Sequence, residues 1–154
     1  MHIEIVAVGK LRPYYRQAAD DYLRRLRRYA HVRELEVREA IRAPNPLAQR
    51  AEEAAQLETR VPEGSTVVAL AREGMGWNSR ELAHQVDRWL LQARPLAFLI
   101  GGSSGLDSSV IARASARWSL GPLTFPHELA RVILYEQLYR AYTILRGEPY
   151  HKGV

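Results

Sequence analysis

The chain has 154 residues, of which 47% are hydrophobic and 25% are charged, a composition typical of one globular domain with a buried core. It has no cysteine, which excludes disulfides, thiolate metal sites and cysteine nucleophiles. No apolar run approaches the roughly 20 residues that span a bilayer, and the first residues suggest a strand rather than a signal peptide, so we expect a cytoplasmic protein without membrane contact.

The net charge of +5 is concentrated in one segment. Residues 10–38 hold nine Lys and Arg against four Asp and Glu, and the rest of the chain is balanced. The densest part contains four arginines: Arg24, Arg25, Arg27 and Arg28. A basic patch of this kind favours a phosphate-bearing partner, RNA or DNA. The alternative is a solvated helix face on which Asp20 and Asp21 pair with the arginines.

Strands and helices are expected to alternate along the chain. In order, the pattern predicts a strand at 2–8, a helix at 13–29, a strand at 32–37, a helix from 46 to before 62, a strand at 65–71, a loop at 72–77, a helix at 80–92, a strand at 96–100, a short helix after 106, a strand at 115–119 and a helix at 126–146. Asn45 with Pro46, and Asn78 or Ser79, are start signals for helices, and Gly147 is a stop signal.

This alternation predicts an α/β fold around a largely parallel sheet. Ligands of such sheets bind beyond the carboxyl ends of the strands. We therefore expect the loops after Ala71, Ile100 and the 115–119 segment to line one site.

Two of these loops are rich in backbone groups. Residues 101–105, Gly-Gly-Ser-Ser-Gly, allow a ligand to approach exposed N–H groups, although a plain tight turn is the alternative. Residues 120–126 are apolar and carry two prolines, which suits a clasp around an adenine whose edge is bonded by the backbone. The alternative for the second loop is a packed segment of the core.

Metal and hydrolase chemistry are not supported. The five histidines have no metal-ligand spacing and no accompanying carboxylate cluster, so we expect no metal. No Gly-x-Ser-x-Gly elbow is present either.

The last helix is apolar over more than one face. Leu134, Leu138, Ala141 and Leu145 form one stripe, while valine, isoleucine and three tyrosines extend it. Such a helix lies deep in a core or is shared with a second subunit, and a twofold dimer is the simplest arrangement.

The carboxyl-terminal motifs resemble a known family. Ile100-Gly101-Gly102-x-x-Gly105-Leu106, Leu123-Thr124-Phe125-Pro126-His127, Arg131-Val132, Glu136-Gln137-Leu138-Tyr139-Arg140-Ala141 and Pro149-Tyr150-His151 resemble the bacterial ribosomal RNA large-subunit methyltransferase H family. The resemblance covers the whole chain, including Val6-Ala7-Val8-Gly9-Lys10.

This resemblance implies a SPOUT fold with a carboxyl-terminal trefoil knot, in a single domain over 1–154 whose knot and cofactor site lie within about 66–154. It implies a homodimer that binds S-adenosylmethionine and methylates N3 of a pseudouridine in helix 69 of 23S rRNA on the assembled ribosome. The implied cofactor contacts are Leu70, Gly101, Leu120, Gly121, Pro122, Leu123, Thr124 and Phe125. Pro122 lacks an N–H donor, so its contact is the weakest of the set.

Deprotonation of the pseudouridine imide requires a base or a cation. The candidates are His151, Tyr150, Arg140 and Arg131, with His127 a weaker one. The tail of one subunit is expected to complete the site of the other. Two rival functions are a ribosome-binding or assembly factor without chemistry, and a SPOUT methyltransferase acting on tRNA.

Overall fold

The computed structural model describes residues 1–152, so residues 153–154 of the predicted domain lie outside the described part. Its strands are β1 (His2–Val8), β2 (His31–Val37), β3 (Thr66–Met75), β4 (Leu96–Ile100) and β5 (Ala116–Trp118). Its helices are α1 (Pro13–Leu26), α2 (Pro46–Glu58), α3 (Ser79–Leu91), α4 (Ser108–Arg113) and α5 (His127–Leu145). The predicted alternation of strands and helices is confirmed.

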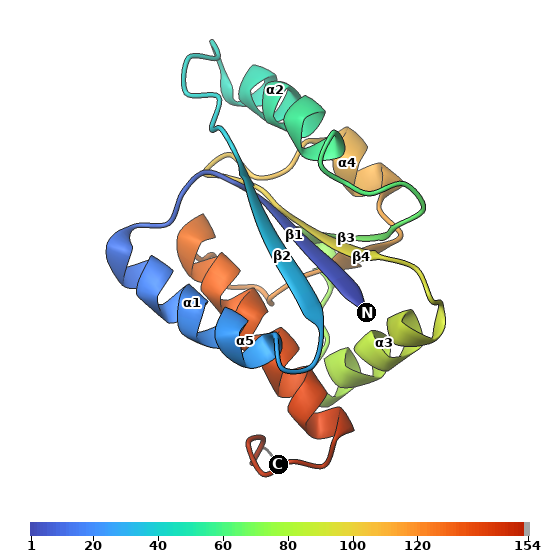
Figure 1. Cartoon of the computed structure of the whole chain (residues 1–154). Helices are drawn as coiled ribbons and strands as arrows, with labels where there is room; N and C mark the ends of the chain where they lie inside the picture. Colours follow the sequence, from blue (N-terminus) through green and yellow to red (C-terminus); the bar gives the residue numbers. More distant parts are fainter. Residues whose placement is uncertain (153–154) are drawn as a thin grey trace.

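The strands form one sheet in the order β2-β1-β4-β3-β5, and every neighbouring pair is parallel. The predicted parallel sheet is therefore confirmed. Figure 1 shows α1, α3 and α5 on one face and α2 and α4 on the other. Both faces are covered, which explains why all five residues of β4 are buried and apolar.

Alternate residues of β1 enter two separate cores. Ile3 and Ile5 pack with residues of α1, α3 and α5 in the larger core. Val6 and Val8 pack with residues of α2 and α4 in the smaller one. The period of two in a strand thus assigns each side chain to its layer.

The predicted start and stop signals of the helices act as expected. The Asn45 side chain accepts a hydrogen bond from Ala48 N, and Asn78 forms a capping box with Glu81. Pro126 precedes α5 as its N-cap, and Gly147 follows it with a φ of +65°, which a glycine adopts without strain.

The first helix ends earlier than predicted. It stops at Leu26, and residues 27–29 form a turn that leads into β2. Its buried face consists of Ala19, Leu23 and Leu26, whereas Tyr22 and Tyr29 only pack at the edge of the core.

The predicted loop at 72–77 is partly wrong. β3 continues to Met75 and pairs with Trp118 of β5 after an irregularity that follows Leu70. A Cβ on Gly74 would lie 2.6 Å from the backbone carbon of Arg117, so the two strands approach closely only because residue 74 is glycine.

Helix α5 is covered within a single chain. It packs against both α1 and α3, and Tyr135, Leu138, Tyr139 and Tyr142 are buried. The apolar surface that suggested a second subunit is therefore accounted for by these contacts, and the homodimer stays a prediction. The trefoil knot also stays a prediction. Within residues 1–152, no helix is long and apolar enough to cross a membrane.

Candidate cofactor-binding and RNA-binding sites

A cavity of about 480 Å³ lies at the carboxyl ends of the strands. Three loops form it, those that follow Leu70, Ile100 and Trp118, together with the first turn of α5. Its lining residues are Leu70, Ala71, Arg72, Ile100, Gly101, Gly102, Ser103, Ser104, Gly105, Trp118, Ser119, Leu120, Gly121, Leu123, Thr124, Phe125, Pro126, His127 and Ala130. The structure thus gathers the three loops that were expected to share a site.

Seven of the eight predicted cofactor contacts line this cavity, and Pro122 does not. Pro122 is exposed, beside Gly121, whose φ of +107° turns the loop there. The Ser119 hydroxyl accepts from Gly121 N at 3.1 Å, and Ser119 N donates to Met75 O at 2.9 Å. The loop is therefore held at its start by the end of β3.

The glycine loop is built by close backbone packing. A Cβ on Gly101 would lie 2.5 Å from the carbonyl carbon of Gly105, and a Cβ on Gly102 would lie 2.9 Å from Val8 Cγ1. Gly105 closes the turn with a φ of +78° and donates to Gly102 O. The sequence prediction left a plain tight turn open; the loop is such a turn and also a wall of the cavity.

Polar side chains of helix α2 bond to the glycine loop. Ser104 Oγ donates to Gln49 Oε1 at 2.9 Å, and Arg50 donates to Ser104 O at 3.4 Å. Ser103 Oγ donates to Glu39 Oε1 at 3.1 Å. These bonds fix the loop to the layer formed by α2.

Two side chains of the cavity lining can carry charge or move protons. Arg72 follows Ala71, and His127 begins α5. Sequence reasoning ranked His127 below the tail residues and missed Arg72, although its place after a strand was the available signal.

Arg131 was predicted to be catalytic, and the structure gives it a structural place instead. It is 1% exposed and does not line the cavity. Its guanidinium lies 2.8 Å from Glu36 and 3.5 Å from Glu34, and it donates to Gly9 O at 3.0 Å. Tyr135 donates to the same Glu34, whose negative charge acts together with burial to raise the Tyr135 pKa well above its ordinary value. Arg131 therefore joins α5 to β2.

The other three predicted catalytic residues lie together. Arg140 pairs with Glu136 at 2.5 Å and lies 4.8 Å from the Tyr150 ring centroid. The Tyr150 hydroxyl donates to Glu136 at 3.0 Å, and burial with this bond raises the Tyr150 pKa. Tyr150 is therefore a neutral hydrogen-bonding group at physiological pH.

His151 lies next to Arg140 in this cluster, with Nδ1 3.2 Å from the Arg140 guanidinium. A guanidinium only donates, so Nδ1 accepts, and a neutral ring then carries its proton on Nε2. In this arrangement His151 orients or donates rather than removes a proton.

The tail cluster (Glu136, Arg140, Tyr150 and His151) and the cavity lie at opposite ends of α5. His127 is in its first turn, and Arg140 follows thirteen residues later, about 20 Å along a helix. Figure 1 likewise shows the carboxyl terminus at the far end of α5 from its first turn. One chain alone does not bring the cluster to its own cavity.

The predicted RNA-binding arginines divide into two pairs. Arg24 and Arg25 both pair with Asp21 at 3.2 Å, while Asp20 pairs with Arg16 instead. The solvated-face alternative thus describes Arg24 and Arg25 in part. Arg25 also lies 5.7 Å from the Tyr139 ring centroid.

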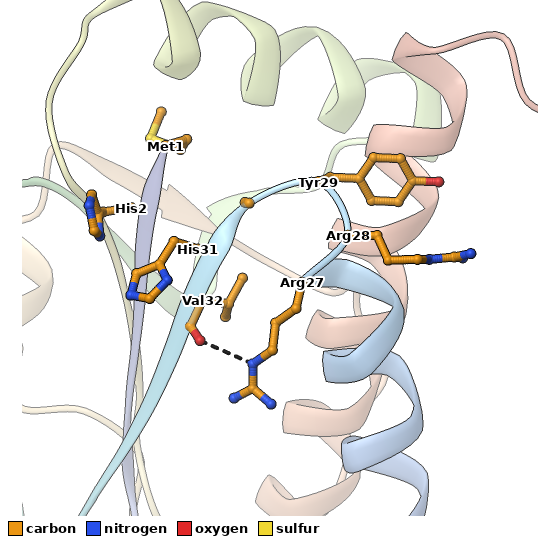
Figure 2. Close-up of a pocket in the computed structure, with 8 residues that line it drawn as sticks. Met1, His2, Arg27, Arg28, Tyr29, His31 and Val32 are labelled. Carbon is orange, nitrogen blue, oxygen red and sulfur yellow. Dashed lines mark hydrogen bonds between the residues drawn. The ribbon is translucent and has the colours of Figure 1, made fainter.

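Arg27 and Arg28 border a second cavity of about 480 Å³ at the amino ends of β1 and β2. Figure 2 shows His2 and His31 side by side there, and Arg27 Nε donating to Val32 O. Arg28 points to the other side of the turn, beside Tyr29. The four arginines do not converge on one point, but they share one end of α1.

Within residues 1–152, no group of three or more His, Cys, Asp or Glu is placed to hold a metal ion. The positively charged and backbone groups described above are the polar features available to ligands.

Comparison with known proteins identifies the family. The sequence model of the family described as "Predicted SPOUT methyltransferase" matches residues 1–151. The chain belongs to the SPOUT methyltransferase family. The resemblance seen in the sequence motifs is thereby confirmed.

The relatives of this SPOUT methyltransferase cover nearly its full length. It is 44% identical over 151 residues to "Ribosomal RNA large subunit methyltransferase H" of Nitratidesulfovibrio vulgaris strain DP4, covering 97% of each chain. The protein of that name from Anaeromyxobacter dehalogenans is 44% identical, covering 99% of this chain and 100% of the relative. The one from Hahella chejuensis is 39% identical over 99% of both chains.

Solved structures support the SPOUT fold. A probable methylase family protein from Haemophilus influenzae superposes with a TM-score of 0.55 at 13% identity, covering 98% of this chain and 70% of that one. A probable methyltransferase from Bordetella pertussis gives a TM-score of 0.53 at 16% identity, with 91% and 95% covered.

Proposed function

We propose that this SPOUT methyltransferase uses S-adenosylmethionine to methylate N3 of a pseudouridine in helix 69 of 23S rRNA, on the assembled ribosome in the cytoplasm. The observation that carries the proposal is the cavity, because three loops far apart in the sequence enclose it with seven predicted cofactor contacts. The name shared by the relatives, ribosomal RNA large subunit methyltransferase H, supports rRNA as the substrate.

The cavity fits the cofactor in size and chemistry. Its volume of about 480 Å³ lies within the range of small-molecule pockets, roughly 300–1,000 Å³. Leu120, Leu123 and Phe125 offer apolar surface for an adenine ring, and the two loops offer backbone donors and acceptors. When bound, the cofactor supplies an electrophilic methyl group on a positively charged sulfur.

The protein must then manage one proton. The pseudouridine N3 forms a bond to the methyl carbon, the electron pair of the broken carbon–sulfur bond stays on sulfur, and the N3 proton leaves. A base or a cation near N3 lowers the barrier to this loss. His127 and Arg72 are the groups of the cavity lining that suit these roles.

The tail cluster completes the site in trans. Arg140, Tyr150 and His151 are tied together through Glu136, about 20 Å along α5 from their own cavity. A second subunit that brings its tail to this cavity would add a fixed cation and two hydrogen-bonding groups. We therefore propose that the active form is a homodimer with composite sites.

A complementation experiment tests the composite site. Gly101→Ala damages the cavity and Tyr150→Phe with His151→Ala damages the tail, so each variant alone should be inactive on ribosomes. Mixed dimers hold one intact composite site, and activity should return to about a quarter of the wild-type rate in an equal mixture. No recovery in confirmed mixed dimers would contradict the proposal.

The substrate is tested by mass mapping of 23S rRNA. A strain lacking the gene should lose one methyl group at a helix 69 pseudouridine, and the plasmid-borne gene should restore it. An unmethylated tRNA position with intact rRNA would favour the tRNA alternative. Calorimetry with S-adenosylmethionine distinguishes an enzyme from a non-catalytic assembly factor, because the latter has no need to bind it.

The arginines at the end of α1 are proposed to bind rRNA phosphates. Arg24, Arg25, Arg27 and Arg28 share one end of the helix, and Arg27 and Arg28 have no printed carboxylate partner within residues 1–152. Free cations release counterions from RNA when they bind, whereas paired ones contribute less. Arg27 and Arg28 should therefore contribute most.

A further inference from the structure

Glu53 of α2 is a buried carboxylate that the proposed mechanism does not use. The residue is 1% exposed. Its Oε2 accepts from Ala40 N at 2.9 Å and from Gln49 Nε2 at 3.2 Å. Its Oε1 is buried and has no hydrogen-bond partner within the described residues 1–152. An acceptor left alone in a core is costly, and such a group calls for a functional explanation.

The free oxygen lies behind the glycine loop. A Cβ on Gly102 would be 3.8 Å from Glu53 Oε1, and Gly102 itself lines the cavity. The Cβ direction of Gly102 points toward Glu53, so the backbone of this glycine separates the carboxylate from the cavity. The absence of a side chain at residue 102 lets the two approach.

The bonding pattern is that of an ionised carboxylate. Both partners of Glu53 are N–H donors, and a protonated acid would need an acceptor as well. No ion pair formed within residues 1–152 includes Glu53. Arg50, one turn earlier on α2, bonds to Ser104 O instead. The negative charge is therefore neutralised by no side chain, and in a buried position it is poorly screened.

We propose that Glu53 is a specificity-determining residue that makes the cavity prefer a cationic cofactor over its neutral product. This inference rests on the proposed function. The sulfur of S-adenosylmethionine carries a positive charge, and methyl transfer leaves the neutral thioether S-adenosylhomocysteine. The charge of Glu53 stabilises the first and not the second. It favours loading of the substrate form and release of the product.

The test compares two dissociation constants in one variant. Calorimetry on the purified protein gives Kd for S-adenosylmethionine and for S-adenosylhomocysteine. Glu53→Gln retains an acceptor for Ala40 N and removes the charge, so the preference for S-adenosylmethionine should fall by about 3–10-fold. Glu52→Gln, the exposed neighbour, is the matched control and should keep the wild-type ratio.

A merely structural role would weaken both ligands equally and leave the ratio unchanged, which would overturn the inference. Gln49→Lys gives an independent route, because it places an ammonium near the carboxylate without removing it, and it should lower the ratio in the same direction. An unchanged ratio in a folded Gln49→Lys protein would likewise count against the inference. If the wild-type protein bound neither compound, the proposed function itself would fail.

Discussion

The guanidinium of Arg131 lies 2.8 Å from the carboxylate of Glu36, between α5 and β2. Arg131 is almost fully buried, and its other bonds go to Glu34 and to Gly9 O. This ion pair joins the helix that begins at the cavity to the strand at the sheet edge. It gives a stabilising role to a residue that the sequence placed in the reaction.

Arg131→Ala should destabilise the fold by about 3–5 kcal/mol, because it leaves two carboxylates facing a buried space without a partner. Urea unfolding measures this loss. Arg146→Ala, at the exposed end of α5, should change stability by less than about 1 kcal/mol. An Arg131→Ala protein with wild-type stability and no activity would restore the catalytic interpretation.

Gly101→Ala should prevent cofactor binding and lower stability by about 1–3 kcal/mol, because its Cβ would overlap the Gly105 backbone at 2.5 Å. Calorimetry and thermal melting measure the two effects. Gly76→Ala is the control, since no atom lies within 4 Å of a Cβ there. Equal behaviour of the two variants would show that the close packing of the glycine loop is not required.

Tyr142→Phe should stabilise the protein by about 1 kcal/mol at neutral pH. The Tyr142 hydroxyl is buried without a partner within residues 1–152, and its removal ends that desolvation cost. The ring stacks on Tyr29 at 5.4 Å, a contact that phenylalanine keeps. Chemical denaturation of both proteins measures the difference, and a loss of stability would indicate an unseen partner for the hydroxyl.

Stability should fall as the pH rises from about 10 to about 12. Burial raises the pKa of Tyr142 to about 12, and burial with the Glu148 bond raises the pKa of Tyr29 to about 12. The folded state therefore binds more protons than the unfolded state in this window, whose lower limit is the ordinary tyrosine pKa of about 10. Tyr142→Phe should make the decline shallower, and an identical slope in both proteins would contradict this cause.

Changing Arg24, Arg25, Arg27 and Arg28 together to Gln should weaken ribosome binding and flatten its dependence on salt. Arg27→Gln with Arg28→Gln should reproduce most of the change, because Arg24 and Arg25 are already paired with Asp21. Filter binding at several salt concentrations measures the slope. A slope that the fourfold variant leaves unchanged would favour a solvated helix face.

Much of the fold follows from local sequence. The β-branched runs at 2–8 and 96–100, and the caps at Asn45 and Asn78, depend on neighbours within a few residues, so pattern and propensity locate them. The common edge of parallel strands also made the shared cavity predictable. The extension of β3 to Met75 was missed because it depends on the contact of Gly74 with Arg117, 43 residues away in the chain.

The sequence by itself determined the family, the parallel sheet and seven residues of the cavity, because motifs and strand order are properties of the chain. Only the tertiary structure decided what each arginine does. Arg131 and Arg140 are nine residues apart on one helix, yet the first is closed in by Glu34 and Glu36 of β2 and the second is bonded to the tail. A side chain's role depends on the charges that other elements bring to it, and that information is absent from its local sequence.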